Sequence, residues 1–178
     1  GNRFFSPASI HTALAMTYAG ARGKTADEMA ETLHYPMAPE PLMGAYRDLL
    51  EAINDAPLQA VTRKKDGRVV RQKEKVFQLV VANALWPQTG YPFRAEYVEN
   101  VEKAFDAKVE AVDYRKPERA AKTINDWVET KTNDKIRDLV PASALRGPIR
   151  LVLTNAVYFQ SNWMHTFSEY RTKDEPFH

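Results

Sequence analysis

The side chains that could carry out chemistry are few, and the histidines come first. Glu31 and His34 lie three positions apart on a predicted helix, which is half of a di-iron carboxylate motif. The complete motif needs a second such helix, and the other copy, Glu175-x-x-His178, contains Pro176 and is not expected to be helical. We therefore expect His34 to be a surface histidine at a helix end, and we expect no metal site. The histidines of the chain are His11, His34, His165 and His178.

Serine side chains near a histidine are the second possibility. Ser6, Ser9 and His11 are close in sequence, but a hydrolytic serine needs a base that a third group orients. Ser6 followed by Pro7 is typical of a helix start, with serine as the N-cap and proline at the first helical position, so capping explains these serines. The sequence has no G-x-S-x-G, H-E-x-x-H, P-loop or Rossmann glycine motif. It therefore favours a protein that is not an enzyme and uses no cofactor.

A basic segment at residues 62–75 is the third feature. Its charge could bind a polyanion such as a glycosaminoglycan. The alternative, which we favour, is a solvated hairpin with its turn at Asp66 and Gly67, whose charges discourage pairing with other sheet edges. The whole chain has 25 basic and 23 acidic residues, so its net charge of +2 attracts neither nucleic acid nor membranes. The residues considered for polyanion binding are Arg63, Lys64, Lys65, Arg68 and Arg71.

An amide in an apolar strand is the fourth feature. The segment LVLTNAVYFQSNW, residues 151–163, alternates as a β-strand with two largely apolar faces, and Asn155 lies in the middle of one of them. An unpaired amide there would cost about 1–3 kcal/mol, so we expect Asn155 to have partners. Asn83 lies in a similar setting in the predicted strand 76–86.

The elements that must position these residues form a helical group followed by alternating strands and helices. The first helix, from Pro7 to about Ala19, is small and apolar and is expected to be buried all round, and the second is expected to begin with a capping box at Thr25. With 44% hydrophobic residues and no cysteine, the chain can bury a core but cannot form disulfides. The pattern predicts a mixed sheet protein. Further helices are expected after Pro41, at 93–105 and after Pro117, and strands at 76–86, 107–114 and 151–163.

Long stretches of the chain resemble the serpin family. FFSPASIHTALAMTYAGARGKTADEMAETL is similar to the first strand with helices B and C of that family, and VANALWPQTGYPFRAEYVENVEKAF to the second strand of its large sheet with the helix that follows. AAKTINDWVETKTNDKI resembles helix F, and RLVLTNAVYFQSNW the third strand of the sheet. The resemblance implies an α+β fold, with a helical group packed on a large mixed β-sheet. It places the 107–114 strand at the sheet edge and 76–86 between it and 151–163.

The resemblance also implies roles for particular residues. Asn155 would belong to a polar "shutter" beneath the strands that separate when the sheet opens, and we expect it to bond to the Ser6–Ser9 segment. Trp163 would lie at the "breach", where strand insertion begins. The simpler alternatives are that Asn155 is a satisfied core amide and that Trp163 only packs. The shutter residues implied are Ser6, Pro7, Ser9, Thr154 and Asn155.

The implied function is inhibition of a serine protease, or a cysteine protease, by a suicide-substrate mechanism with loop insertion. In the family pattern the reactive loop follows His178 and helix A precedes Asn2, so we expect residues 1–178 to be one serpin domain incomplete at both ends and inactive alone. Alternatives are a non-inhibitory relative acting as a carrier, chaperone or storage protein, or a polyanion-binding module. The resemblance implies an extracellular or secreted protein; the lack of cysteine and of a visible signal peptide leaves an intracellular one open.

Overall fold

The computed structural model describes residues 5–54, 58–65, 68–75, 77–161, 163 and 169–174. The chain divides into two compact units. The first consists of Gly1–Asp55 with Leu79–Tyr158, and the second of Ala56–Gln78 with Phe159–His178. Each unit is described by itself. In the described residues, no helix is long and apolar enough to cross a membrane.

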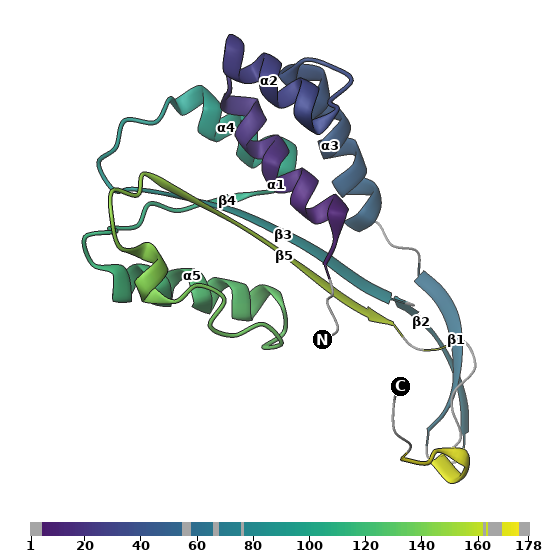
Figure 1. Ribbon diagram of the computed structural model, residues 1–178. Coiled ribbons are helices and arrows are strands. Elements are labelled where there is room, and N and C mark those ends of the chain that lie inside the picture. Colours follow the sequence, from purple (N-terminus) through teal and green to yellow (C-terminus); the bar gives the residue numbers. More distant parts are fainter. Residues whose placement is uncertain are drawn as a thin grey trace. The chain divides into compact units, whose positions relative to one another are not determined.

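The first unit holds a helical group and most of a three-stranded sheet (Figure 1). The strands alternate with the last two helices along the chain, as the sequence predicts. The helices are α1 (Pro7–Gly20), α2 (Lys24–Leu33), α3 (Pro39–Asn54), α4 (Ala95–Phe105) and α5 (Pro117–Lys131), with a 3-10 turn η1 (Ala142–Leu145). The strands are β3 (Phe77–Pro87), β4 (Lys108–Val109) and β5 (Leu151–Ser161).

The sheet has the strand order β4-β3-β5, which confirms that the three predicted strands share one sheet with the 107–114 segment at its edge. β4 pairs with β3 in parallel, with Ala84 opposite Lys108. Gln88, just after β3, donates its backbone N–H to the carbonyl of Arg150, just before β5, at 2.9 Å. β5 therefore runs antiparallel to β3. In the described residues the other edge of β5 has no partner strand.

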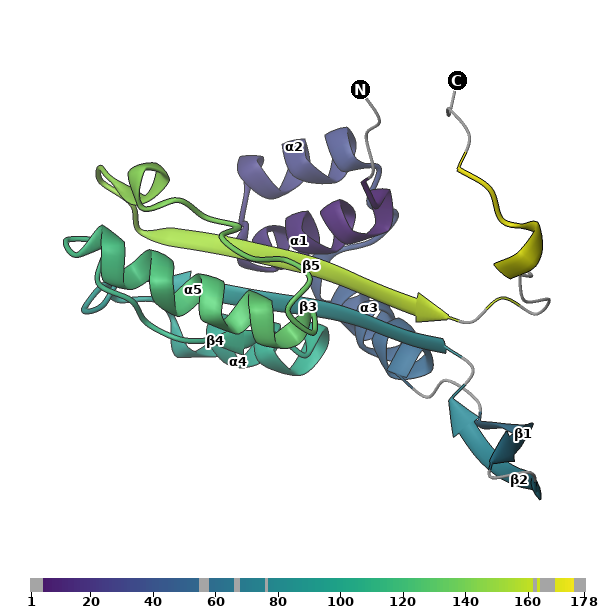
Figure 2. The ribbon, with the colours of Figure 1, turned by 90° about the horizontal axis from the view of Figure 1, so that it is seen from below.

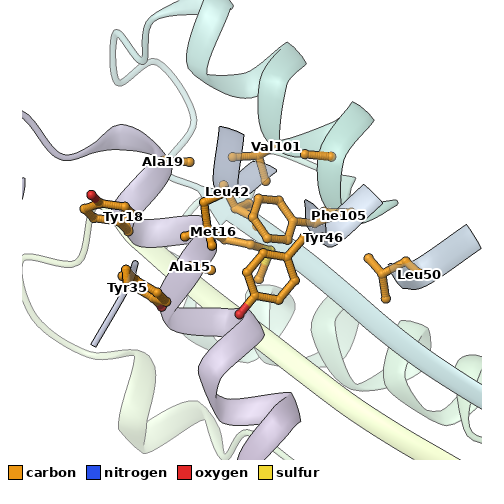
Figure 3. Close-up of a cluster of buried hydrophobic side chains, with 13 residues drawn as sticks. Ala15, Met16, Tyr18, Ala19, Tyr35, Leu42, Tyr46, Leu50, Val101 and Phe105 are labelled. Atoms are coloured by element: carbon orange, nitrogen blue, oxygen red, sulfur yellow. The ribbon is translucent and has the colours of Figure 1, made fainter. Parts of the chain in front are cut away.

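The two faces of the sheet are covered by different helices (Figure 1, Figure 2). Helices α1, α3 and α4 pack on one face, where Met16 and Phe105 lie in a buried cluster (Figure 3). Leu85 of β3 belongs to the same cluster. Leu151 and Leu153 of β5 contact the same cluster. These strand residues are all odd-numbered, because successive side chains of a strand point to opposite faces.

The other face lies under α5. Ala84 and Trp86 of β3 are fully buried against Ile124, and Trp127 meets Trp86 edge to face with ring centroids 5.7 Å apart. Such aromatic pairs contribute about 0.5–1.5 kcal/mol beyond the area they bury. The helix expected after Pro117 is thus present, and the apolar side that carries Ile124 and Trp127 holds it against the sheet.

Three local predictions differ from the structure. α1 is not buried all round: it buries Met16 but leaves Ile10 52% exposed, because helices cover only one of its sides. α2 begins at Lys24 without a side-chain cap, because Gly23 takes the N-cap position with φ of 55°, so the capping box at Thr25 is wrong. Among the described residues, the pairing of the 107–114 strand is limited to β4 and an isolated bridge between Gln88 and Val112.

The second unit contains a hairpin of β1 (Leu58–Lys65) and β2 (Arg68–Lys75). The two strands are antiparallel from Leu58↔Lys75 to Lys65↔Arg68, which confirms the hairpin interpretation of the basic segment. Its predicted turn residues, Asp66 and Gly67, lie outside the described residues. A short 3-10 turn, η2 (Glu169–Arg171), belongs to the same unit.

Candidate functional site: an amide pair at the centre of the sheet

Asn155 is hydrogen-bonded to a second asparagine on the neighbouring strand. Its side-chain N–H donates to Oδ1 of Asn83 at 2.7 Å. The two residues lie on the face of the sheet that the helical group covers, Asn83 with 1% of its surface exposed and Asn155 half-buried. Directly opposite residues of antiparallel strands have Cβ atoms about 4.5–5.5 Å apart, which suits two short amide side chains.

The amide of Asn83 also satisfies the end of a helix. Its Nδ2 donates to the carbonyl oxygen of Phe105 at 3.0 Å, and Phe105 is the last residue of α4. The last four carbonyls of a helix have no partner within it, and here the chain turns away at Asp106 with a left-handed φ of 47°. Asn83 therefore ties α4, β3 and β5 together through one amide group.

A second polar pair joins the same two strands from the opposite face. The indole N–H of Trp86 donates to Oγ1 of Thr154 at 2.9 Å, and both groups are buried. Thr154, expected in the same network as Asn155, thus points away from it and lies under α5. Side-chain hydrogen bonds therefore join β5 to β3 on both faces of the sheet.

The Ser6–Ser9 segment forms the start of α1, as predicted. Oγ of Ser6 accepts the backbone N–H of Ser9 at 3.3 Å, and Pro7 occupies the first helical position. Ser9 is buried. In the described residues Asn155 donates to Asn83 on the neighbouring strand, and no hydrogen bond joins it to either serine. Its membership of a network with the Ser6–Ser9 segment stays a prediction.

The other candidate residues are spread over the chain. Trp163 is 73% exposed, and His34 is exposed at the C-cap of α2, as predicted for a helix-end histidine. His11 is hydrogen-bonded through Nδ1 to the Tyr46 hydroxyl, and burial raises the pKa of that tyrosine. Among the described residues, no group of three potential metal ligands is found. Of the basic residues proposed for polyanion binding, Arg68 is exposed, and the side chains of Arg63, Lys64, Lys65 and Arg71 lie outside the description, as do His165 and His178.

Asn83 is the residue whose role the sequence alone did not assign. Its setting in an apolar strand resembles that of Asn155 and was a usable signal, because two amides at the centres of neighbouring strands can satisfy each other. The Trp86–Thr154 bond had no comparable signal. A tryptophan N–H buried in a strand needs an acceptor, but the sequence does not say which.

Comparison with known proteins places this sheet in a family. The model of the family described as "Serpin (serine protease inhibitor)" matches residues 1–178. The chain belongs to the serpin family. A serpin-like protein from Thermococcus kodakarensis is 42% identical over 178 residues, 99% of this chain and 38% of that protein.

Solved serpin structures are similar to this chain in fold. A cleaved Serpin 42Da is 34% identical, with a TM-score of 0.79 over 98% of this chain and 42% of that one. Cleaved kallistatin complexed with heparin is 25% identical, with a TM-score of 0.81 over all of this chain and 48% of that one. The chain thus spans less than half the length of these serpins, and it is similar to them throughout.

Proposed function

We propose that the full-length serpin containing this chain inhibits a serine protease by inserting a cleaved loop into the sheet beside β5. The observation that carries the proposal is the match of the family model to residues 1–178, together with the sheet order β4-β3-β5, in which β5 is the outermost strand of the described residues. A strand added there would gain backbone hydrogen bonds along its length, as in other cases of strand addition. The family's description as serine protease inhibitors, rather than enzymes, supports this assignment.

In the proposed mechanism, a protease cleaves a loop outside this chain and stays attached to it as an acyl-enzyme. The loop then pairs with β5 and carries the protease with it, driven by relief of strain and by strand pairing. Asn83 and Thr154 hold β5 to β3 from the two faces while the opposite edge opens. Asn155 uses one N–H for Asn83, which leaves a second N–H and its oxygen for partners that change as the sheet opens.

The remaining residues have supporting roles in this proposal. The start of α1, with Ser6, Pro7 and Ser9, forms the fixed support beneath the opening strands. Trp163 follows β5 at the point where insertion begins. In the same proposal the protein is secreted, and its partner is a serine protease or, by the same chemistry, a cysteine protease.

Substitution of Asn155 in the full-length protein tests the mechanism. Asn155→Leu should alter the rate of loop insertion, measured as formation of SDS-resistant protease complex, while circular dichroism stays unchanged. Asn125→Leu is a matched control, because Asn125 of α5 makes two hydrogen bonds to the backbone of Val140 and, among the described residues, none to the sheet. Equal insertion rates in the parent and Asn155→Leu would contradict the switch role. Absence of any protease complex would favour a non-inhibitory carrier, chaperone or storage serpin.

A second candidate function is polyanion binding through the basic hairpin. The observation in its favour is the heparin complex of kallistatin, a serpin of similar fold. Neutralising Arg63, Lys64 and Lys65 together should then lower the salt concentration needed to elute the protein from heparin. The control removes the three exposed charges of Lys24, Lys103 and Lys122. Equal shifts in both variants would show that only net charge matters.

A further inference from the structure

A cavity lined by three arginines opens beside the end of β3 and the beginning of β5. Figure 2 shows that α5 lies next to this end of the two strands. Its volume is about 640 Å³, within the range of about 300–1,000 Å³ common for small-molecule sites. The arginines are Arg115, Arg146 and Arg150, and a single carboxylate, that of Glu118, lines the cavity with them. No part of the proposed inhibitory mechanism uses this cavity.

The three arginines differ in how strongly each is paired with a carboxylate of the protein. Arg115 is bound to Asp113, with Nε 2.7 Å from the carboxylate, and this hydrogen bond lowers the pKa of Asp113 to about 2. Arg146 contacts Glu118 only at 3.4 Å, and both side chains are largely exposed, so that pair is weak.

Arg150 has no carboxylate partner among the described residues. Its guanidinium donates to the carbonyl of Ile149 at 3.2 Å and lies 5.7 Å from the ring centre of Tyr91. A guanidinium has five N–H donors in a planar fork that matches carboxylate and phosphate oxygens. Most donors of Arg150 therefore remain available to a ligand in the cavity.

The wall of the cavity is held firmly around these charges. The side-chain oxygen of Gln88 accepts the backbone N–H of Tyr114 at 2.9 Å, and the hydroxyl of Tyr114 donates to the carbonyl of Trp86. α5 begins in the same wall at Pro117, and its N-cap residue, Lys116, makes no side-chain capping bond. The positive end of the helix dipole adds to the arginine charge.

We infer that this cavity binds the phosphate or sulfate group of a small molecule. The oxyanion is held between Arg146 and Arg150, and it displaces Glu118 from Arg146. Arg115 stays bound to Asp113, which neutralises its charge, and it only borders the site. The cavity is larger than the anion alone, so an organic group attached to it also fits.

Isothermal titration calorimetry of the full-length protein tests the inference, with inorganic phosphate and glycerol phosphate as probes and sodium chloride keeping the ionic strength constant. We expect one saturable site with a Kd at or below about 1 mM. Arg150→Gln should weaken binding about tenfold or more, because it removes charge-assisted hydrogen bonds. Glu118→Gln should strengthen binding about threefold, because it removes the competing carboxylate. Tighter binding of glycerol phosphate would show that the site also recognises the organic part.

Arg47→Gln is the matched control, since Arg47 is an exposed arginine of α3 paired with its neighbour Asp48. It should leave the Kd unchanged. Heats that do not saturate, equal weakening in Arg150→Gln and Arg47→Gln, or no gain in Glu118→Gln would each overturn the inference. Protease trapping by the Arg150→Gln protein should be normal, so the outcome is independent of the proposed inhibitory function.

Discussion

Replacing Asn83 with leucine should destabilise the protein by about 2–4 kcal/mol, because leucine keeps the approximate shape but removes both amide hydrogen bonds. The buried carbonyl of Phe105 loses its donor, which costs about 1–3 kcal/mol for an unsatisfied buried group. Asn155 loses its acceptor but is half-buried and can turn toward water, so its share is about 1 kcal/mol. Asn155→Leu should cost less than Asn83→Leu, since the bond from Asn83 to Phe105 survives.

The measurement is urea unfolding of the full-length protein, followed by tryptophan fluorescence, for both single variants and the double variant. The double variant should be more stable than the sum of the single effects predicts, by about 0.5–1.5 kcal/mol, because the bond between the two amides can be lost only once. An Asn83→Leu protein within about 0.5 kcal/mol of the parent would refute the reasoning, since a change of that size is typical of surface sites. Strict additivity would show that the two amides do not interact.

Three further predictions follow from other contacts. Gly20→Ala should destabilise the protein by about 1–3 kcal/mol, because a Cβ there would lie 2.9 Å from the Tyr97 ring. Gly44→Ala in α3, where a Cβ meets open space, should instead stabilise the protein by about 0.5–1 kcal/mol. Thermal unfolding measures both variants. Burial raises the pKa of Tyr97 to about 12, so its contribution to stability is complete below about pH 10 and is lost as the pH rises through about 12. Tyr97→Phe should reduce this loss of stability at alkaline pH, measured by urea unfolding at a series of pH values. An unchanged dependence of stability on pH would contradict the prediction. Residues 1–178 expressed alone should aggregate through the outer edge of β5 and inhibit no protease. A monomer by light scattering with a cooperative transition by calorimetry would contradict the expected aggregation. SDS-resistant trapping of trypsin would contradict the expected lack of inhibition.

The sheet could be predicted from sequence because its signals are periodic. Alternation in β3 and β5 assigns their odd residues to one face and their even residues to the other, and the stripe of Ile124 and Trp127 identifies the helix that covers the even face. Each of these signals is local and repeated several times along an element. They were sufficient to predict the strands and the helix that became α5, whereas the order of the strands in the sheet came from the family resemblance.

The partner of Asn155 could not be predicted in the same way. Polarity shows that a buried amide needs a partner, but the choice depends on the register between two strands some seventy positions apart, and no local pattern encodes it. The prediction of a capping box at Thr25 was wrong for a related reason. The N-cap residue is Gly23, which has a positive φ, so the helix begins before Thr25. The cavity lined by arginines was equally hidden, since only the fold brings Arg115 together with Arg146 and Arg150, which belong to one loop before β5.

The carbonyl of Phe105 gives a way to observe the sheet from a helix that packs on it. Its acceptor strength depends on how strongly Asn83 is polarised, and that in turn depends on whether Asn155 donates to the other end of the same amide. A carbon-13 label on this carbonyl, in the last turn of α4, should therefore shift its NMR frequency when β5 changes partners. The state of the sheet can then be followed in solution without a probe on any inserted strand.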